Sequence, residues 1–228
     1  MTSSGWTLHN RGFARTLVYL PGWATDYRLL PKERLTWNVL APDGLACDTE
    51  GLADAIAQLS APPVLVGWSL GASLAAEFVQ RHPAAVNGVV LVSGQPSWAL
   101  EPIDTLREAL AVDSRAALRR FYAQCFHGGD RAAFASFRRG LESDYLDRFA
   151  LTDLIAGLDA LAAATLPHEL IAAPVRCLHG SGDIVAPVAD MVRWANDSGV
   201  PIRVVDGASH AIIVRDEFID TINGLQRG

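Results

Sequence analysis

Three residues of this sequence, Ser69, Asp183 and His210, are of the types that together make a serine hydroxyl nucleophilic. A serine attacks a carbonyl carbon only when a base accepts its proton, and that base needs a partner that fixes its tautomer. Histidine and a carboxylate supply these two functions. The three residues therefore predict acyl transfer, with Ser69 as nucleophile, His210 as base and Asp183 as orienting acid.

The sequence around Ser69 is Gly67-Trp68-Ser69-Leu70-Gly71, with an apolar run over 64–66 before it. Apolar residues at helical spacing follow it as far as Arg81. A Gly-x-Ser-x-Gly sequence between a strand and a helix is typical of a nucleophile elbow, where the serine occupies a tight, strained turn. We expect the turn to place Ser69 at a helix N-terminus, where amide groups stabilise a developing oxyanion.

Asp183 and His210 each follow a predicted strand, at 175–179 and at Ile202–Val205. Serine, acid and histidine in this chain order, each on a loop just past a strand, can meet at one edge of a parallel sheet. Asp183 has an alternative interpretation, because an aspartate in this position can also cap the helix that follows.

Other acids and histidines fit these roles less well. Asp190 falls inside a predicted helix, and Asp206 ends a strand, where it would satisfy its own turn. His82 ends a helix before Pro83 and His179 ends a strand, so neither follows the last strand as a base should.

A second oxyanion donor is predicted at the end of the first apolar core strand, Thr16–Leu20. Pro21, Gly22 and Trp23 follow this strand, and a glycine turn in this place can present the Trp23 backbone N–H to the reacting carbonyl. An ordinary turn is the alternative.

Strands and helices alternate along most of the chain, which indicates a mostly parallel, doubly wound α/β sheet. Further strands are predicted at 37–43 and 89–92, and helices at 49–59, 73–81, 187–196 and 216–225. The alternation of strands and helices stops between 97 and 168, where only helices are predicted, at 103–111, 114–126, 131–141 and 151–164. We interpret this stretch as a short helical lid inserted before the last two strands. The expected division is a first core part (1–96), the lid (97–168) and a second core part (169–228).

Composition limits the remaining functions. The chain has 228 residues, of which 50% are hydrophobic, enough for one domain with a small lid. Its net charge of −6 argues against a nucleic-acid partner. Cys47, Cys125 and Cys177 show no metal-ligand spacing and suit a reducing compartment. No segment approaches the roughly 18 apolar residues of a membrane span. We therefore expect a cytoplasmic monomer with no metal and no organic cofactor.

The motifs of this chain resemble those of the α/β-hydrolase superfamily. They are Gly22-Trp23, Gly67-Trp68-Ser69-Leu70-Gly71, His82-Pro83 and a Gly-x-x-Asp-x-x-x-Pro sequence over 180–187. Trp68 before the serine is less common in that superfamily than the glycine frame. It narrows the resemblance to the esterases of biotin synthesis that demethylate pimeloyl-acyl-carrier-protein methyl ester. Two positions depart from the pattern, since Pro21 stands where histidine is usual and Ala72 where a third glycine is frequent.

This resemblance implies an α/β-hydrolase fold and a serine carboxylic-ester hydrolase with the triad Ser69, Asp183 and His210. It also implies that the Leu70 and Trp23 amides form the oxyanion hole and that Trp68 and Trp23 shape the acyl site. In those esterases, lid arginines hold an acidic acyl carrier protein. The candidates here are Arg115, Arg119, Arg120, Arg138 and Arg139, for which a solvated helix surface is the alternative. The alternative functions are a general short-chain carboxylesterase, a carbon–carbon bond hydrolase and, in another class, a non-catalytic ligand receptor.

Overall fold

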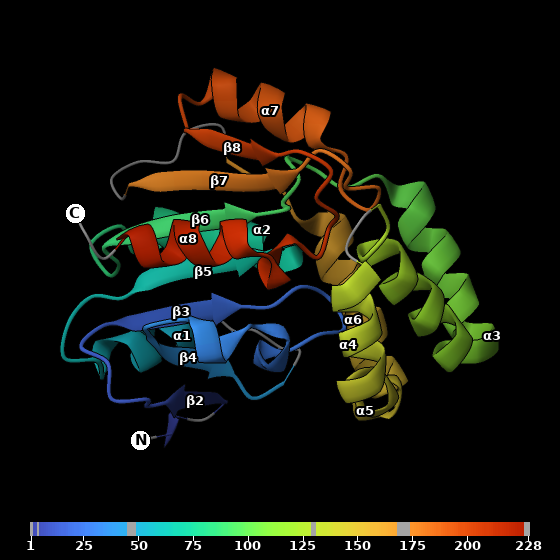
Figure 1. The fold of residues 1–228 in the computed structure, drawn as a ribbon, viewed down its shortest axis with the longest axis horizontal. Coiled ribbons are helices and arrows are strands. Elements are labelled where there is room, and N and C mark those ends of the chain that lie inside the picture. The colour runs from blue at the N-terminus through green and yellow to red at the C-terminus, as the bar shows by residue number, and fades with distance from the viewer. Residues whose placement is uncertain (1, 4, 45–48, 129–130, 168–173, 226–228) are drawn as a thin grey trace.

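The computed structural model of this protein describes residues 2–3, 5–44, 49–128, 131–167 and 174–225. These residues form an eight-stranded sheet with the strand order β1-β2-β4-β3-β5-β6-β7-β8 (Figure 1). The strands are β1 (Thr2–Ser3), β2 (Trp6–His9), β3 (Thr16–Leu20), β4 (Asn38–Pro42), β5 (Val64–Trp68), β6 (Gly88–Val92), β7 (Val175–Gly180) and β8 (Ile202–Val205). The helices are α1 (Thr49–Ala57), α2 (Leu70–Arg81), α3 (Leu100–Cys125), α4 (Arg131–Gly140), α5 (Glu142–Arg148), α6 (Leu151–Ala163), α7 (Val188–Asp197) and α8 (Asp216–Gly224).

Pairing is parallel from β4 through β3, β5, β6 and β7 to β8, and antiparallel where β2 meets β1 and β4. The predicted mostly parallel sheet is therefore confirmed. Since parallel strands point the same way, the loops that follow β3, β5, β7 and β8 emerge at one edge of the sheet (Figure 1).

Successive residues of the central strands point into two separate cores. In β3, Leu17 and Tyr19 belong to the core that includes α8 and the helices between β6 and β7. Val18 and Leu20 belong to the core that includes α1, α2 and α7. Both faces of the sheet are covered, which confirms the doubly wound prediction and explains the unbroken apolar runs in the sequence.

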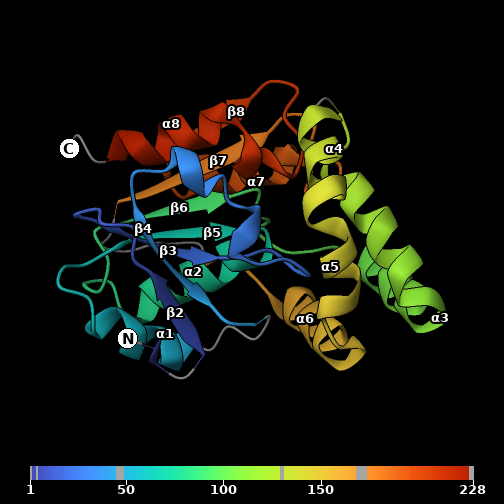
Figure 2. The same ribbon diagram turned by 60° about the horizontal axis from the view of Figure 1, so that its bottom comes forward.

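Helices α3–α6, called the lid helices below, lie between β6 and β7 in the chain. Figures 1 and 2 show them beyond the carboxyl ends of the strands, on the side away from both termini. The two helices predicted at 103–111 and 114–126 are the two halves of α3, which is broken at Asp113, where the backbone is not helical. The Asp113 carboxylate accepts the Ala116 N–H at 2.9 Å and so caps the second half. The division of the chain at 97 and 168 remains a prediction.

Helix α5 was not predicted. It is only 7 residues long, and among its residues only Tyr145 and Leu146 are buried, which leaves too few apolar positions to define a helical period. Among the helices of the described ranges, none combines the length and apolar character that crossing a membrane requires.

Candidate active site

Ser69 lies at the turn between β5 and α2 with φ 57° and ψ −119°, a positive φ that is unusual for a residue other than glycine. The two glycines of the motif allow this turn. A Cβ on Gly67 would lie 2.1 Å from the Gly71 carbonyl oxygen, and a Cβ on Gly71 would lie 2.1 Å from the Leu20 carbonyl oxygen. Strand, turn and helix are therefore packed too closely for any side chain at either position.

Asp183 and His210 are in direct contact. Oδ2 of Asp183 lies 2.8 Å from Nδ1 of His210, on the loops that follow β7 and β8. The other oxygen, Oδ1, accepts the backbone N–H groups of Val185 at 3.0 Å and Ala186 at 2.7 Å. Asp183 thus fixes its own loop and the imidazole at once. The alternative role as a cap of α7 is not what the structure shows, because α7 begins after Pro187 without a side-chain cap.

The electrostatics of this pair favour a carboxylate beside the imidazole. Burial alone would raise the pKa of Asp183, but attraction to His210 and hydrogen bonds from His179 and His210 outweigh it. The pKa of Asp183 therefore lies well below its usual range, and Asp183 stays ionised throughout the neutral range.

The second nitrogen of His210, Nε2, is buried and has no hydrogen-bond partner. With Nδ1–H donating to Asp183, Nε2 carries a lone pair and can accept a proton. Ser69 and His210 lie on adjoining loops, because the indole N–H of Trp68 donates to the His210 carbonyl at 2.8 Å. The loop that carries His210 is thus bonded to the residue next to Ser69, and transfer of the Ser69 proton to Nε2 remains a prediction.

Trp68 is buried in the core, with its ring 5.4 Å from that of His210. Its side chain supports the loop that carries His210. A contact between Trp68 and the acyl group of a substrate remains a prediction.

His179 is a further histidine near the site, and sequence reasoning did not find its role. It is fully buried at the end of β7, where its Nε2 lies 2.7 Å from the Ala186 carbonyl and 3.4 Å from Oδ2 of Asp183. The signal available in the sequence was its position four residues before Asp183. The competing acids are engaged elsewhere, since Asp190 pairs with Arg193 and Asp206 accepts the Ser181 hydroxyl.

The loop after β3 lies directly against the nucleophile. A Cβ on Gly22 would lie 2.9 Å from the Trp68 ring and 3.1 Å from the Ser69 Cβ. The Trp23 N–H follows Gly22 in this loop. Leu70 is the first residue of α2, so its N–H has no acceptor within the helix. The role of the Trp23 and Leu70 amides in holding an oxyanion remains a prediction.

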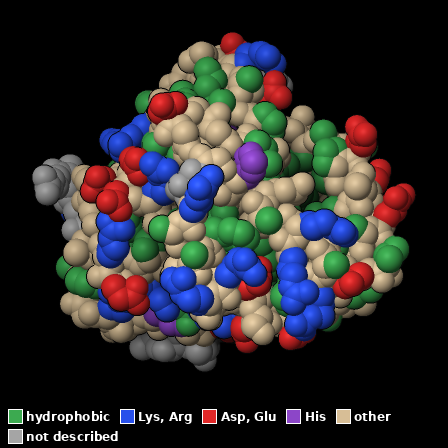
Figure 3. Space-filling view, turned by 45° about the vertical axis from the view of Figure 1, so that its right-hand side comes forward, with side chains coloured by type: hydrophobic (Ala, Val, Ile, Leu, Met, Phe, Trp, Pro, Cys, Tyr) green, Lys and Arg blue, Asp and Glu red, His purple; other side chains and the backbone are tan. Residues whose placement is uncertain are grey.

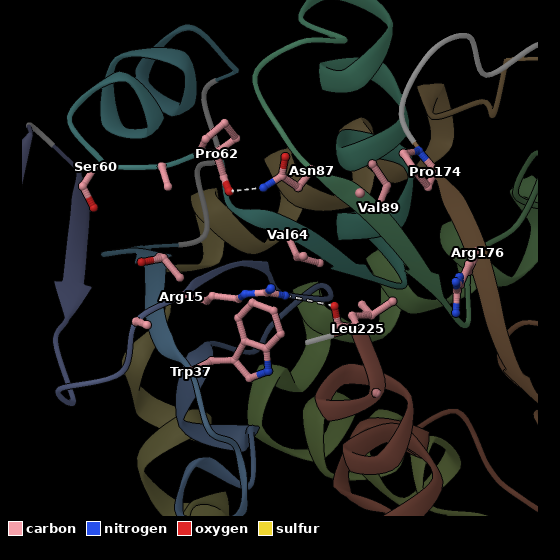
Figure 4. A pocket seen from close by; sticks show the side chains of 15 residues that line it. Arg15, Trp37, Ser60, Pro62, Val64, Asn87, Val89, Pro174, Arg176 and Leu225 are labelled. Atoms are coloured by element: carbon pink, nitrogen blue, oxygen red, sulfur yellow. Dashed lines mark hydrogen bonds between the residues drawn. The ribbon is translucent and has the colours of Figure 1, made fainter. Parts of the chain in front are cut away.

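The triad residues are covered by protein, with 4% of Ser69, 5% of Asp183 and 1% of His210 exposed. A cavity of about 520 Å³ lies at the opposite, amino edge of the sheet (Figure 4). Its lining includes Arg15, Trp37, Asn87 and Arg176 but none of the triad residues. In the described part of the chain, no group of three or more His, Cys, Asp or Glu side chains could hold a metal ion. Cys125 and Cys177 are buried free thiols, whereas Cys47 lies outside the described residues.

Two of the five candidate arginines on the lid helices lie against acidic side chains. Arg115 pairs with Asp147, and Arg138 lies 3.7 Å from Glu142 on the next helix. Arg119, Arg120 and Arg139 are exposed. Figure 3 shows basic side chains over the face that includes the lid, with acidic ones among them. The structure therefore offers exposed cations on α3 and α4 in a surface of mixed charge.

The chain matches the model of a known protein family. A family model described as "Alpha/beta hydrolase family" matches residues 2–220. The chain belongs to the alpha/beta hydrolase family. This membership confirms the predicted resemblance and the predicted fold.

Two curated proteins resemble the chain over nearly its full length. It is 28% identical to a pimeloyl-[acyl-carrier protein] methyl ester esterase of Nitrosospira multiformis, over 96% of this chain and 90% of that protein. It is 26% identical to a protein of the same name from Serratia marcescens, over 99% of this chain and 98% of that protein.

Solved structures of similar fold include an esterase from Exiguobacterium antarcticum, with a TM-score of 0.83 at 17% identity over 98% of this chain and 96% of that one. A bromoperoxidase from Bacillus anthracis has a TM-score of 0.82 at 18% identity, over 98% of this chain and 95% of that one. At these identities the likeness establishes the α/β-hydrolase fold and says nothing about the substrate.

Proposed function

We propose that this protein is a serine carboxylic-ester hydrolase that cleaves pimeloyl-acyl-carrier-protein methyl ester in biotin synthesis, a cytoplasmic pathway. The observation that carries the proposal is the buried Asp183–His210 pair, which leaves Nε2 of His210 without a partner and lies on a loop bonded to Trp68 of the Ser69 turn. Nearly full-length similarity to proteins named for this activity supports the proposed identity of the substrate.

The first half of the reaction forms an acyl-enzyme. The Ser69 hydroxyl attacks the ester carbonyl while Nε2 of His210 accepts its proton, and Asp183 stabilises the imidazolium that results. Negative charge develops on the former carbonyl oxygen, where the N–H groups of Trp23 and Leu70 hold it. His210 then gives its proton to the departing alkoxide, which leaves as methanol.

The second half repeats these steps with water as nucleophile. His210 accepts a proton from water, the hydroxide attacks the acyl-enzyme, and the same two amides hold the second oxyanion. Ser69 recovers its proton as the carboxylic acid leaves. The chemistry needs no group beyond this chain and water.

The carrier protein would be held at exposed arginines of the lid helices, among them Arg119, Arg120 and Arg139. An acidic carrier is repelled at long range by a protein of net charge −6, so a local basic patch has to outweigh this repulsion. Arg115 and Arg138 would have to leave Asp147 and Glu142 before they could contribute.

One experiment tests the substrate. We would measure kcat/KM for pimeloyl-acyl-carrier-protein methyl ester and for short p-nitrophenyl esters at two salt concentrations. The proposal predicts efficient turnover of the carrier-bound ester that weakens as salt rises. The double variant Arg119→Ala/Arg120→Ala should lose this salt dependence, and Arg193→Ala, on α7, is the matched control. Turnover of small esters alone would make the protein a general carboxylesterase.

A second experiment tests the chemistry. Ser69→Ala should lower kcat by several orders of magnitude, on the order of 10⁶ if the triad acts as one unit. A fluorophosphonate should label the wild type at Ser69 and leave the variant unlabelled. Near-full ester turnover by Ser69→Ala would contradict the mechanism. A wild type that neither reacts with the fluorophosphonate nor turns over esters would favour a non-catalytic receptor.

A further inference from the structure

The loop over 21–26, called the oxyanion loop here because it carries the Trp23 N–H, is bonded to three of the lid helices. The Tyr122 hydroxyl of α3 donates to the Ala24 carbonyl at 2.7 Å. The Tyr145 hydroxyl of α5 donates to Oδ1 of Asp26 at 2.7 Å. The Trp23 indole N–H donates to the Leu154 carbonyl of α6 at 2.9 Å. All three bonds are buried, so water does not readily replace them.

The backbone of this loop is strained at its centre. Ala24 has φ 55°, in the left-handed region that a residue with a Cβ adopts only when its surroundings hold it there. Tyr122 binds the carbonyl of this same residue. On the other side of Trp23, Gly22 accepts the N–H of Thr25 at 3.3 Å and its hydroxyl at 2.8 Å. The conformation that directs the Trp23 N–H is therefore set partly within the loop and partly by α3.

The Trp23 side chain is held on two sides by the lid helices. Its ring meets Phe121 of α3 edge-on, with ring centroids 4.8 Å apart. On α6, a Cβ at Gly157 would lie 2.7 Å from the Trp23 Cδ1, so this helix approaches the indole as closely as its backbone allows. Any movement of α3 or α6 away from the sheet would be transmitted to Trp23.

We propose that the lid helices are a positioning part of the oxyanion hole, with Tyr122 and Tyr145 holding the oxyanion loop so that the Trp23 N–H faces Ser69. Ser69 and His210 are almost completely covered, so a substrate reaches them only when a covering segment moves, and in this proposal the lid helices are that segment. That movement breaks bonds to the oxyanion loop, and their return completes the hole. Substrate enclosure and oxyanion stabilisation are therefore coupled. This inference rests on the proposed function.

The test compares three variants with the wild type on a p-nitrophenyl ester. Tyr122→Phe removes the hydroxyl and keeps the ring, and its kcat should fall about tenfold, less than the 10²–10³ of a deleted oxyanion donor. KM should change little, because the oxyanion hole binds the ground-state carbonyl oxygen more weakly than it binds the oxyanion. Tyr145→Phe should show the same fall in kcat with little change in KM. Tyr19→Phe is the matched control, since the buried Tyr19 hydroxyl has no partner and belongs to the same core.

A rescue separates positioning from general destabilisation. Ala24→Gly removes the steric cost of the positive φ, so Tyr122→Phe/Ala24→Gly should recover much of the lost kcat. Affinity for a trifluoromethyl ketone, whose adduct with Ser69 carries an oxyanion, should fall and recover in parallel.

The inference is overturned if Tyr122→Phe and Tyr145→Phe both match Tyr19→Phe in kcat, or if Ala24→Gly recovers nothing. In these cases the proposed esterase reaction still stands, provided that the wild type turns over ester and Ser69→Ala does not. A wild type without such turnover would overturn the proposed function together with this inference.

Discussion

The indole N–H of Trp68 donates a 2.8 Å hydrogen bond to the backbone carbonyl of His210, 142 residues further along the chain. The residue before the proposed nucleophile thus supports the loop of the proposed base. Both residues are buried, so the bond is made without competition from water. It fixes the separation of two loops that come from β5 and β8, strands that are not neighbours in the sheet.

Trp68→Phe removes this donor and leaves an aromatic ring in the core. The buried His210 carbonyl then lacks a partner, which costs about 1–3 kcal/mol of stability, and the imidazole loses part of its support. We expect kcat to fall about tenfold, the equivalent of 1.4 kcal/mol in the barrier, with little change in KM. Unchanged kcat together with a raised KM would instead assign Trp68 to substrate binding.

His179→Phe tests the second histidine on Asp183. Nε2 of His179 carries its proton, because the Ala186 carbonyl at 2.7 Å can only accept, and the same N–H lies 3.4 Å from Oδ2 of Asp183. Loss of this N–H should loosen the loop that orients His210. We expect kcat to fall about tenfold and the free energy of unfolding to fall by about 1–3 kcal/mol. Steady-state kinetics and urea unfolding measure the two effects. A stability loss with unchanged kcat would leave His179 a purely structural residue.

The parts of the fold that could be predicted from the sequence are those with a local signal. The parallel strands are continuous apolar runs because both faces of the sheet are covered, and β8 was predicted with the bounds that the structure has. The Ser69, Asp183 and His210 assignment followed from chain order after strands. The break of α3 was also visible, since Asp113 separates two amphipathic segments.

The parts that could not be predicted depend on contacts between distant residues. Tyr122 and Ala24 are 98 residues apart, Tyr145 and Asp26 are 119 apart, and Trp23 and Leu154 are 131 apart. Each of these residues reads as ordinary core or surface in its own segment. Their hydrogen bonds arise only from how the lid helices rest on the sheet, which no periodicity encodes.

Asp26→Asn tests the buried carboxylate beneath the lid. Burial would raise the pKa of Asp26, but hydrogen bonds from Arg28 and Tyr145 outweigh it and hold the pKa below its usual value. Arg148 of α5 adds an ion pair, with Nε 3.1 Å from Oδ2. A lowered folded-state pKa means that the ionised group stabilises the fold fully above the unfolded pKa of about 3.9 and less as pH falls through the folded value.

The wild type should therefore be more stable than Asp26→Asn by roughly 1–2 kcal/mol near neutral pH. This difference should stay constant down to about pH 5 and shrink below about pH 4. Urea unfolding of both proteins between pH 3 and pH 7 measures it, and Asp183 contributes equally to both. A difference that does not depend on pH would show that the charge of Asp26 is not what stabilises the lid contact.

Gly157→Ala and Gly140→Ala should differ in their effect on kcat, although both replace a glycine of a lid helix. A Cβ at Gly157 would lie 2.7 Å from the Trp23 ring, whereas a Cβ at Gly140 would meet nothing within 4 Å. Alanine favours a helix over glycine by up to about 1 kcal/mol, so Gly140→Ala should be neutral or slightly stabilising with unchanged kcat.

Gly157→Ala gains the same helix propensity but displaces Trp23, whose backbone N–H is a proposed oxyanion donor. We expect its kcat to fall by roughly 10–100-fold while its melting temperature stays close to that of the wild type. Equal kcat in the two variants would mean that the position of the Trp23 ring does not affect the hole.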